Sequence, residues 1–235
     1  MTMQAPLPSP MLPDTAEVAV LADYGAPLLQ ALARCETALP PGAGEGLVAA
    51  LARIALALQA DNPTRIRQQE SWWGRLLGRD VDREAEGRAL QSQLGVLALQ
   101  AREQAQHLQQ HVQLRAMAIA EHSAAATALD AWAELATSRL TQLDAAGQAA
   151  LSQRRDHLRR LATLRRLEAG QWQLLQDQDD VLLQRFARIH DVLLPAWRQA
   201  ALADQAAAGA ALAGKAATLH AQIDDEVAAA QARLR

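Results

Sequence analysis

Residues 90–143 read LQSQLGVLALQAREQAQHLQQHVQLRAMAIAEHSAAATALDAWAELATSRLTQL, and this stretch decides the fold. Apolar residues recur in it at spacings of three and four, the pattern of a coiled-coil helix. They are Leu90, Leu94, Leu97, Ala101, Ile119, Ala126, Leu129, Ala133, Ala136, Leu140 and Leu143. The pattern predicts one helix from about Asp82 to Leu143, roughly 90 Å long at 1.5 Å per residue. Gln104, Arg115 and His122 interrupt the middle of this seam, where polar residues cost stability and can fix register.

A second long helix is predicted after the turn signal at residues 144–147, which read DAAG. It begins near Gln148 and continues at least to Leu194. Its apolar positions are Leu151, Leu158, Leu161, Leu175, Leu182, Phe186, Ile189 and Leu193. No capping residue immediately precedes Pro195, so we expect a kink in a helix that continues. The Ala-rich remainder of the chain is expected to pack along the two long helices as part of a bundle.

The first 80 residues predict a tail and short helices. Residues 1–13 are rich in proline and lack Lys and Arg, which indicates a disordered tail. Residues 14–17, DTAE, are a capping-box pattern for a helix to about Ala38, in which Pro27 is a weak point. A Pro/Gly breaker precedes a helix over 45–60. We therefore expect three parts: a disordered tail at 1–13, short N-terminal helices at 14–80, and a long-helix bundle at 81–235.

The composition agrees with an all-α fold. Hydrophobic residues make up 50% of the 235 residues and aromatic ones only 3%, so the apolar content is mostly Ala and Leu, which are strong helix formers. No segment alternates with period two, so no strand is predicted. We expect an elongated antiparallel bundle of long helices with coiled-coil character.

Charge and cysteine content exclude several classes of protein. The net charge of −3 argues against nucleic-acid binding, which usually needs a basic excess. The single cysteine, Cys35, excludes an internal disulfide framework and a cysteine zinc site. The first residues lack a secretory pattern and no apolar run is long enough for a membrane span, so we expect a cytoplasmic location, with peripheral contact at the inner membrane as an open alternative.

No motif of a known catalytic or nucleotide-binding site is found, and we expect a protein that is not an enzyme and needs no cofactor or metal. His107 and His111 could share a helix face as metal ligands, but no nearby Cys supports this and Glu103 is the only candidate carboxylate, so a solvated or seam-lining pair is the favoured interpretation. Two acidic sets could bind a cation, but consecutive acids on a helix point in different directions. These sets are Asp177, Asp179 and Asp180, and Asp224, Asp225 and Glu226.

An arginine cluster is the first candidate surface for a partner. It contains Arg154, Arg155, Arg159, Arg160, Arg165 and Arg166, spread over a broad face of one helix. Such a face could bind an anion or an acidic partner segment. The alternative is a solvated face whose arginines pair with carboxylates such as Asp156 and Glu168 or with a neighbouring helix.

Trp72 and Trp73 form the second candidate, because leucines and arginines surround them in residues 64–80. Aromatic rings beside arginines are typical of a segment that lies at a membrane interface or contacts a partner. The alternative is a short helix that docks its two indole rings onto the bundle.

Three stretches together resemble the toxic-anion resistance (TelA-like, tellurite resistance) family. Residues 170–185, GQWQLLQDQDDVLLQR, are similar to the family's segment in which an apolar pair and Gln lead to an Asn/Asp-rich patch. Residues 194–199, LPAWRQ, resemble its Ile-Pro-Leu/Ala-Trp-Lys motif, and 73–78, WGRLLG, resemble an aromatic-Gly segment. The matching motif residues are Gln176, Asp177, Pro195, Trp197, Arg198 and Gln199. The chain is shorter than the family pattern and has Trp172 where Pro-Gln is usual, as in a divergent member.

The resemblance implies a non-enzymatic helical protein linked to tolerance of tellurite or related stress. We expect an adaptor or scaffold that binds partner proteins of a resistance or stress system, and the sequence leaves the oligomeric state open. One alternative is a membrane-associating or pore-forming helical protein anchored by Trp72 and Trp73. Another is a thiol reductant of the oxyanion, for which the chain offers only Cys35.

Overall fold

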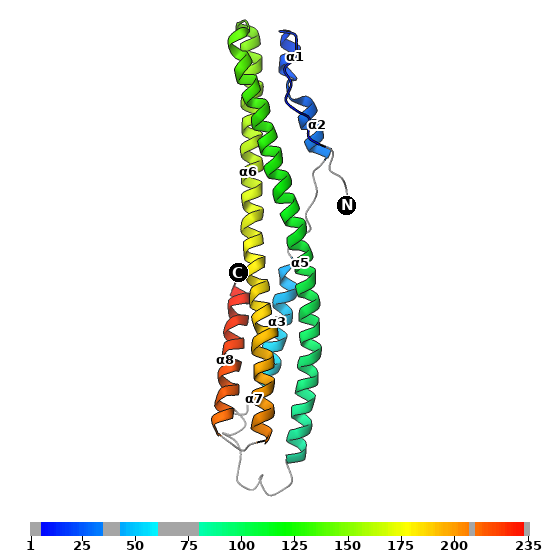
Figure 1. Cartoon of the computed structure of the whole chain (residues 1–235), viewed down its shortest axis with the longest axis vertical. Helices are drawn as coiled ribbons and strands as arrows, with labels where there is room; N and C mark the ends of the chain where they lie inside the picture. The colour runs from blue at the N-terminus through cyan, green and yellow to red at the C-terminus, as the bar shows by residue number, and fades with distance from the viewer. Residues whose placement is uncertain (1–5, 35–42, 61–79, 207–209, 233–235) are drawn as a thin grey trace. The chain divides into compact units, whose positions relative to one another are not determined.

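The structure, a computed structural model, describes residues 6–34, 43–60, 80–206 and 210–232. The helices in chain order are α1 (Val18–Ala22), α2 (Ala26–Arg34), α3 (Gly44–Ala60), α5 (Asp80–Arg139), the 3-10 turn η2 (Leu140–Gln142), α6 (Ala145–Ala187), the π-helical segment η3 (Arg188–Leu193), α7 (Leu194–Ala206) and α8 (Ala210–Ala232) (Figure 1). The described ranges contain no strand. The predicted all-α class is therefore confirmed.

The two predicted long helices are α5, with 60 residues, and α6, with 43. The connection between them lies at residues 140–144, so of the predicted turn 144–147 only Asp144 is outside α6, which begins at Ala145 rather than near Gln148. Asp144 acts as its N-cap, since its Oδ1 accepts a hydrogen bond of 2.8 Å from the Gly147 amide. The Gln148 side chain donates to the Leu143 carbonyl at 2.9 Å, which satisfies an acceptor on the other side of the turn.

The N-terminal helix differs from the prediction. Glu17 is the N-cap residue without a side-chain capping bond, and its amide donates to Thr15 Oγ1 at 2.9 Å, so the expected capping box from Asp14 does not form. The helix then breaks at Gly25, where φ is +79°, and not at Pro27. Pro27 falls in the first turn of α2, where a missing amide hydrogen costs nothing.

Two compact units divide the chain. Unit 1 contains residues 1–40 and 113–177, and unit 2 contains residues 41–112 and 178–235. Each unit thus joins an N-terminal segment to parts of the long helices, whereas the sequence-based division followed chain order at residues 13 and 80.

The core of unit 1 joins α1 and α2 to the second part of α5 and the first part of α6. It is built from Leu21, Tyr24, Leu28, Leu32, Ala125, Leu129, Trp132, Ala133, Ala136, Leu143, Leu151, Leu158 and Ala162. The Tyr24 hydroxyl donates to the Trp132 carbonyl at 2.9 Å, and the two rings lie 5.1 Å apart. Trp132 Nε1 donates to the Pro8 carbonyl at 3.1 Å, and Leu7 and Leu12 pack against this core, so residues 6–13 of the expected tail contact the helices.

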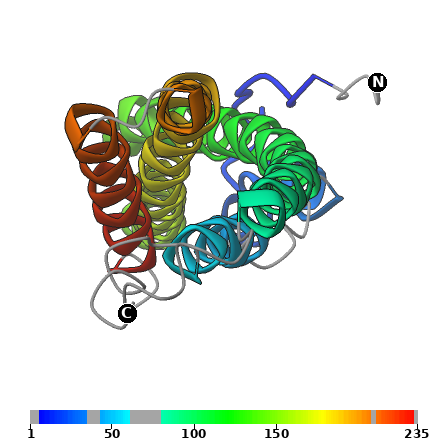
Figure 2. The ribbon, with the colours of Figure 1, turned by 90° about the horizontal axis from the view of Figure 1, so that it is seen from below.

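The core of unit 2 joins α3, the first part of α5, η3, α7 and α8, and Figure 2 shows α3, α7 and α8 in this arrangement. Its buried residues include Leu51, Ile54, Leu94, Leu108, Leu182, Ile189, Trp197, Ile223 and Val227. Glu226 on α8 accepts from Arg185 at 2.6 Å and from Arg188 at 2.8 Å. Because Glu226 is largely buried, this pair of ionic contacts holds α8 against the end of α6 and η3.

Pro195 lies inside a helix that continues, as predicted. The six residues before α7 form the π-helical segment η3. A π turn is wider than an α turn, which relieves the clash of the proline ring with the preceding turn and accommodates the missing amide hydrogen. Trp197, two residues further on, is only 8% exposed and lies in the core of unit 2, which confirms the prediction that its ring is buried.

Candidate partner-binding surface on α6

The six arginines of the predicted cluster have different roles in the structure. Arg154 Nε donates to the Tyr24 carbonyl, so this side chain ties α6 to the end of α1 within unit 1. Arg155 pairs with its neighbour Asp156 at 2.7 Å. Both had been proposed to bind a partner, but Arg154 has a structural role and Arg155 already has a carboxylate at its guanidinium.

The C-terminal arginines of the cluster are also paired. Arg165 contacts Glu168 at 3.0 Å, and the same carboxylate lies 3.0 Å from His122 Nδ1 on α5. Arg166 forms an ion pair with Asp130 on α5. Arg115, from the polar part of the predicted seam, is buried in unit 1. Of the polar residues in the middle of the seam, His122 thus contacts α6 within unit 1, whereas Gln104 belongs to unit 2, where its side chain lies against Gly46 of α3.

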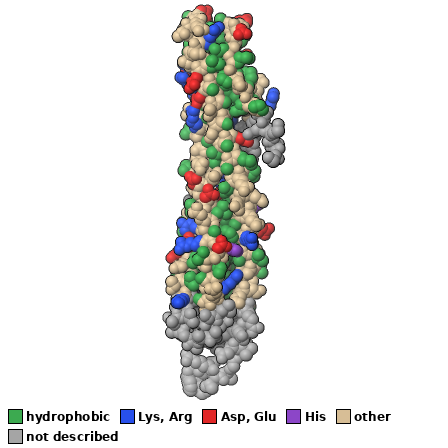
Figure 3. All heavy atoms as spheres, in the orientation of Figure 1, with side chains coloured by type: hydrophobic (Ala, Val, Ile, Leu, Met, Phe, Trp, Pro, Cys, Tyr) green, Lys and Arg blue, Asp and Glu red, His purple; other side chains and the backbone are tan. Residues whose placement is uncertain are grey.

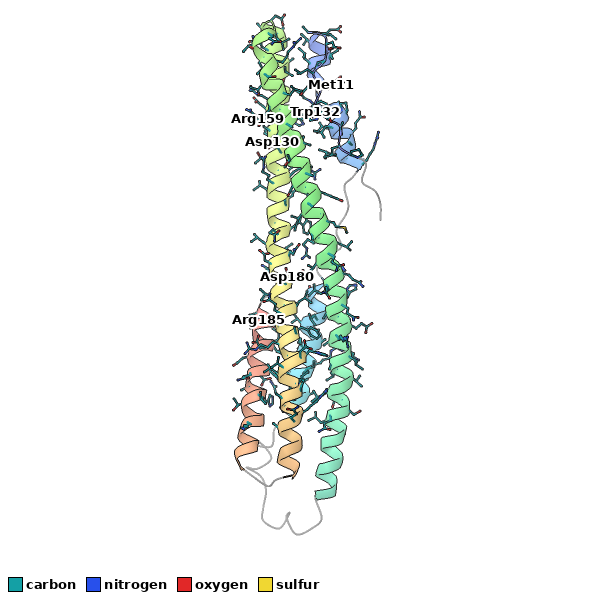
Figure 4. The ribbon with its side chains drawn as sticks, viewed as in Figure 1. Met11, Asp130, Trp132, Arg159, Asp180 and Arg185 are labelled. Atoms are coloured by element: carbon teal, nitrogen blue, oxygen red, sulfur yellow. The ribbon has the colours of Figure 1, made fainter. Side chains whose placement is uncertain are left out.

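Arg159 and Arg160 remain as the accessible part of the cluster. Both side chains are exposed, and within the described ranges neither guanidinium has a hydrogen bond or an ion pair. Figure 4 shows Arg159 in the part of unit 1 that holds Asp130 and Trp132. Two adjacent free guanidinium groups on one turn of helix can bind carboxylates through bidentate hydrogen bonds.

Exposed leucines continue along α6 from these two arginines. Leu164, Leu167 and Leu174 are 48%, 62% and 65% exposed, and we call these three residues the leucine stripe. At 3.6 residues per turn they lie on the side of α6 opposite its core-facing residues Leu158, Ala162 and Ala169. Figure 3 shows apolar side chains reaching the surface between charged ones along the helices. Together with Arg159 and Arg160, the leucine stripe forms the outer face of α6.

This surface was not predicted from the sequence. Leu175 was predicted to lie in the apolar seam of the helix, which is wrong because its side chain is 42% exposed. The available signal was the spacing of seven that links Arg160, Leu167 and Leu174. This spacing marks a second seam beside the one that faces the core.

The motif residues shared with the resistance family fall in both units. In unit 1, Gln176 Oε1 is buried and accepts no hydrogen bond from the described residues, while Asp177 is exposed and accepts from Gln173 at 2.9 Å. In unit 2, Trp197 is buried. The Arg198 Nε atom is also buried and has no hydrogen-bond partner among the described residues. Pro195 is half-buried beside it, and Gln199 is exposed.

The remaining candidates form no ligand site among the described residues. Trp72 and Trp73 lie outside those residues, as does Cys35. The His107 and His111 rings lie with centroids 4.7 Å apart and are tilted by 51° to each other. No group of three or more His, Cys, Asp or Glu side chains in the described ranges could hold a metal ion. Asp224, from the second acidic set, accepts from Gln59 at 3.3 Å and lies 3.4 Å from His220.

Comparison with known proteins gives one distant similarity. The chain is 26% identical to Protein KlaA of Escherichia coli over 202 residues, which cover 80% of this chain and 79% of KlaA. No protein-family model matches the chain, and no solved structure is significantly similar to it. None of the helices in the described ranges combines the length and the apolar character needed to cross a membrane.

Proposed function

We propose that this chain is a non-enzymatic helical adaptor of a toxic-anion or stress resistance system, which acts by binding partner proteins. The setting is supported by the stretches at 170–185 and 194–199, which resemble the tellurite-resistance family. The distant similarity to Protein KlaA extends over most of both chains.

The outer face of α6 is the observation that carries the binding role. Monomeric proteins seldom leave several large apolar side chains in a row exposed, and contiguous patches of this kind mark interaction sites. The leucine stripe offers apolar area, and Arg159 and Arg160 offer two free cations at one end of it. This combination suits an amphipathic protein segment with acidic groups, because leucines bury its apolar side and guanidinium groups bind its carboxylates.

The arginines that already have partners within unit 1 support the same assignment of roles in the cluster. Arg154, Arg165 and Arg166 each have a partner within unit 1, so they contribute to the unit's own structure. Reversing the charge of Arg159 and Arg160 should therefore change what the surface binds without unfolding the protein.

The first prediction concerns these two residues. A tagged chain carrying Arg159→Glu and Arg160→Glu should lose, by at least tenfold, the partner proteins that the unaltered chain retains from the native cell, because the new carboxylates repel an acidic partner. A quantitative pull-down measures the loss, and circular dichroism should show unchanged helicity. The matched control is Arg102→Glu with Lys215→Glu, two exposed residues that give the same change in net charge. Equal capture by both double variants would assign Arg159 and Arg160 to a solvated surface.

A further inference from the structure

The outer face of α6 has the spacing of a coiled-coil seam. Arg160, Leu167 and Leu174 are seven residues apart, and Leu164 and Gln171 follow the first two of them by four residues. Alternating steps of four and three are the repeat that lets one helix pack knobs-into-holes against another. Since the core of unit 1 covers the opposite side of α6, this second seam is left without a helix in the described residues of unit 1.

The two ends of the leucine stripe carry opposite charges. Arg159 and Arg160 precede it with free guanidinium groups, and Asp177 follows it as an exposed carboxylate. The Asp177 carboxylate accepts from the Gln173 amide and has no cation beside it among the described residues. Arg159 and Asp177 lie 18 positions apart, or about 27 Å along the helix axis. A helix that fits this face needs an acid at one end and a base at the other.

We propose that the occupant is a second copy of this chain, with its α6 antiparallel to the first. This inference rests on the proposed function, because it takes the same face as the protein-binding surface and names its partner. When the pair is centred on Glu168, Arg159 of each copy is level with Asp177 of the other. A two-fold axis repeats this ion pair at both ends, as an isologous interface requires.

The apolar residues interleave in the same register. Leu167 lies next to the axis and packs beside Leu167 of the second copy. Leu164 of each copy falls between the levels of Gln171 and Leu174 of the other, so its side chain enters the gap between those two residues. Gln171 is the one polar residue inside the stripe, and a polar residue in a seam fixes register at some cost in stability.

A parallel pair fits this face less well. It would set Arg159 and Arg160 against the same residues of the second copy and Asp177 against Asp177, and like charges at these positions repel. The distribution of charge along α6 therefore selects the antiparallel orientation.

The test uses the purified full-length chain. Sedimentation equilibrium should give a dimer for the unaltered protein and a monomer for Leu167→Glu, because that substitution puts two carboxylates together at the axis. Leu99→Glu, at a residue on α5 that is 66% exposed, is the matched control and should remain dimeric. A monomeric unaltered chain, or a Leu167→Glu variant that still dimerises, would overturn the proposal.

Cysteine cross-linking tests the orientation and does not depend on the glutamate variant. In a Cys35→Ser background, Leu167→Cys should form a disulfide between copies on mild oxidation. Arg159→Cys should cross-link to Asp177→Cys when the two variants are mixed, but not to itself. Cross-linking of Arg159→Cys to itself would show a parallel pair and overturn the antiparallel assignment.

The two proposals fail separately. In one outcome, the pure unaltered chain is monomeric, but Arg159→Glu with Arg160→Glu removes its cellular partners. This result would support the adaptor function and refute the second copy as the occupant of the face. A chain that dimerises through Leu167 but retains no other protein from the cell would refute the adaptor function and support the dimer.

Discussion

Arg154 and Arg160 lie less than two turns apart on α6, yet only one of them is available to a partner. The difference comes from the neighbouring helices. Arg154 donates to the Tyr24 carbonyl in the turn between α1 and α2, whereas Arg160 is exposed on the outer face and has no hydrogen bond or ion pair in the described part of unit 1. The sequence shows a cluster of arginines, but which guanidinium groups are free depends on contacts with residues up to 130 positions away.

At the same scale, Tyr24 allows a prediction about pH. Burial raises the pKa of its hydroxyl from 10.0 to about 12, because the ionised form loses hydration, and the neutral hydroxyl donates to the Trp132 carbonyl. The folded state therefore keeps the proton between pH 10 and 12 while the unfolded state releases it. The free energy of unfolding should fall as pH rises through this interval.

Tyr24 is the chain's single tyrosine, so its ionisation can be followed directly by ultraviolet absorbance. The titration midpoint of the folded protein should be near 12. The Tyr24→Phe variant lacks this hydroxyl. Its free energy of unfolding should therefore fall less between pH 10 and 12 than that of the unaltered protein. A midpoint at the ordinary value for tyrosine would show that the ring is solvated.

At the scale of single elements, long helices were predictable and their interruptions were less so. The seam of threes and fours in α5 extends over many turns, and no local residue competes with it, so its ends were predicted to within a few residues. One helix to about Ala38 was predicted, with Pro27 as its weak point, but proline is harmless in the first turn of α2. Gly25 breaks the helix because tertiary contacts hold it in a left-handed conformation, which the local pattern does not reveal.

Gly25 and Gly170 give a matched pair of predictions. Gly25→Ala should destabilise the protein by about 1–2 kcal/mol, because alanine disfavours a positive φ. The added methyl group would also lie 3.3 Å from both terminal methyl groups of Leu158. Gly170→Ala should stabilise it by up to about 1 kcal/mol, since the residue is inside α6 with open space around it. Urea unfolding of both variants measures the two changes, and a destabilisation of the same size at both positions would contradict this explanation.

The candidate surface could be predicted only in part. Arg159 and Arg160 were named from the sequence, but the leucine stripe was not, because one helix carries two apolar patterns and a leucine does not show which pattern it belongs to. Leu158 is buried and Leu167 is exposed although both fit an apolar repeat. Only the position of α5, α1 and α2 around the first pattern shows that the second remains open.

At the scale of the whole molecule, the distant similarity to KlaA extends over most of both chains, while the structure divides into two units that both contribute motif residues. The proposed binding surface lies within unit 1, on α6. The proposed adaptor role needs a rigid helix to present the binding residues, and the Arg166–Asp130 ion pair and the contact of Glu168 with His122 join α6 to α5 beside Leu164 and Leu167.

Site-specific photo-cross-linking can show whether protein covers the outer face of α6 in the cell. A photoreactive amino acid at Leu167 should yield a discrete covalent adduct of protein mass in the native cell. The same amino acid at Leu99, which is equally exposed, should yield none. A chain that stays free of adducts at Leu167 would contradict the account.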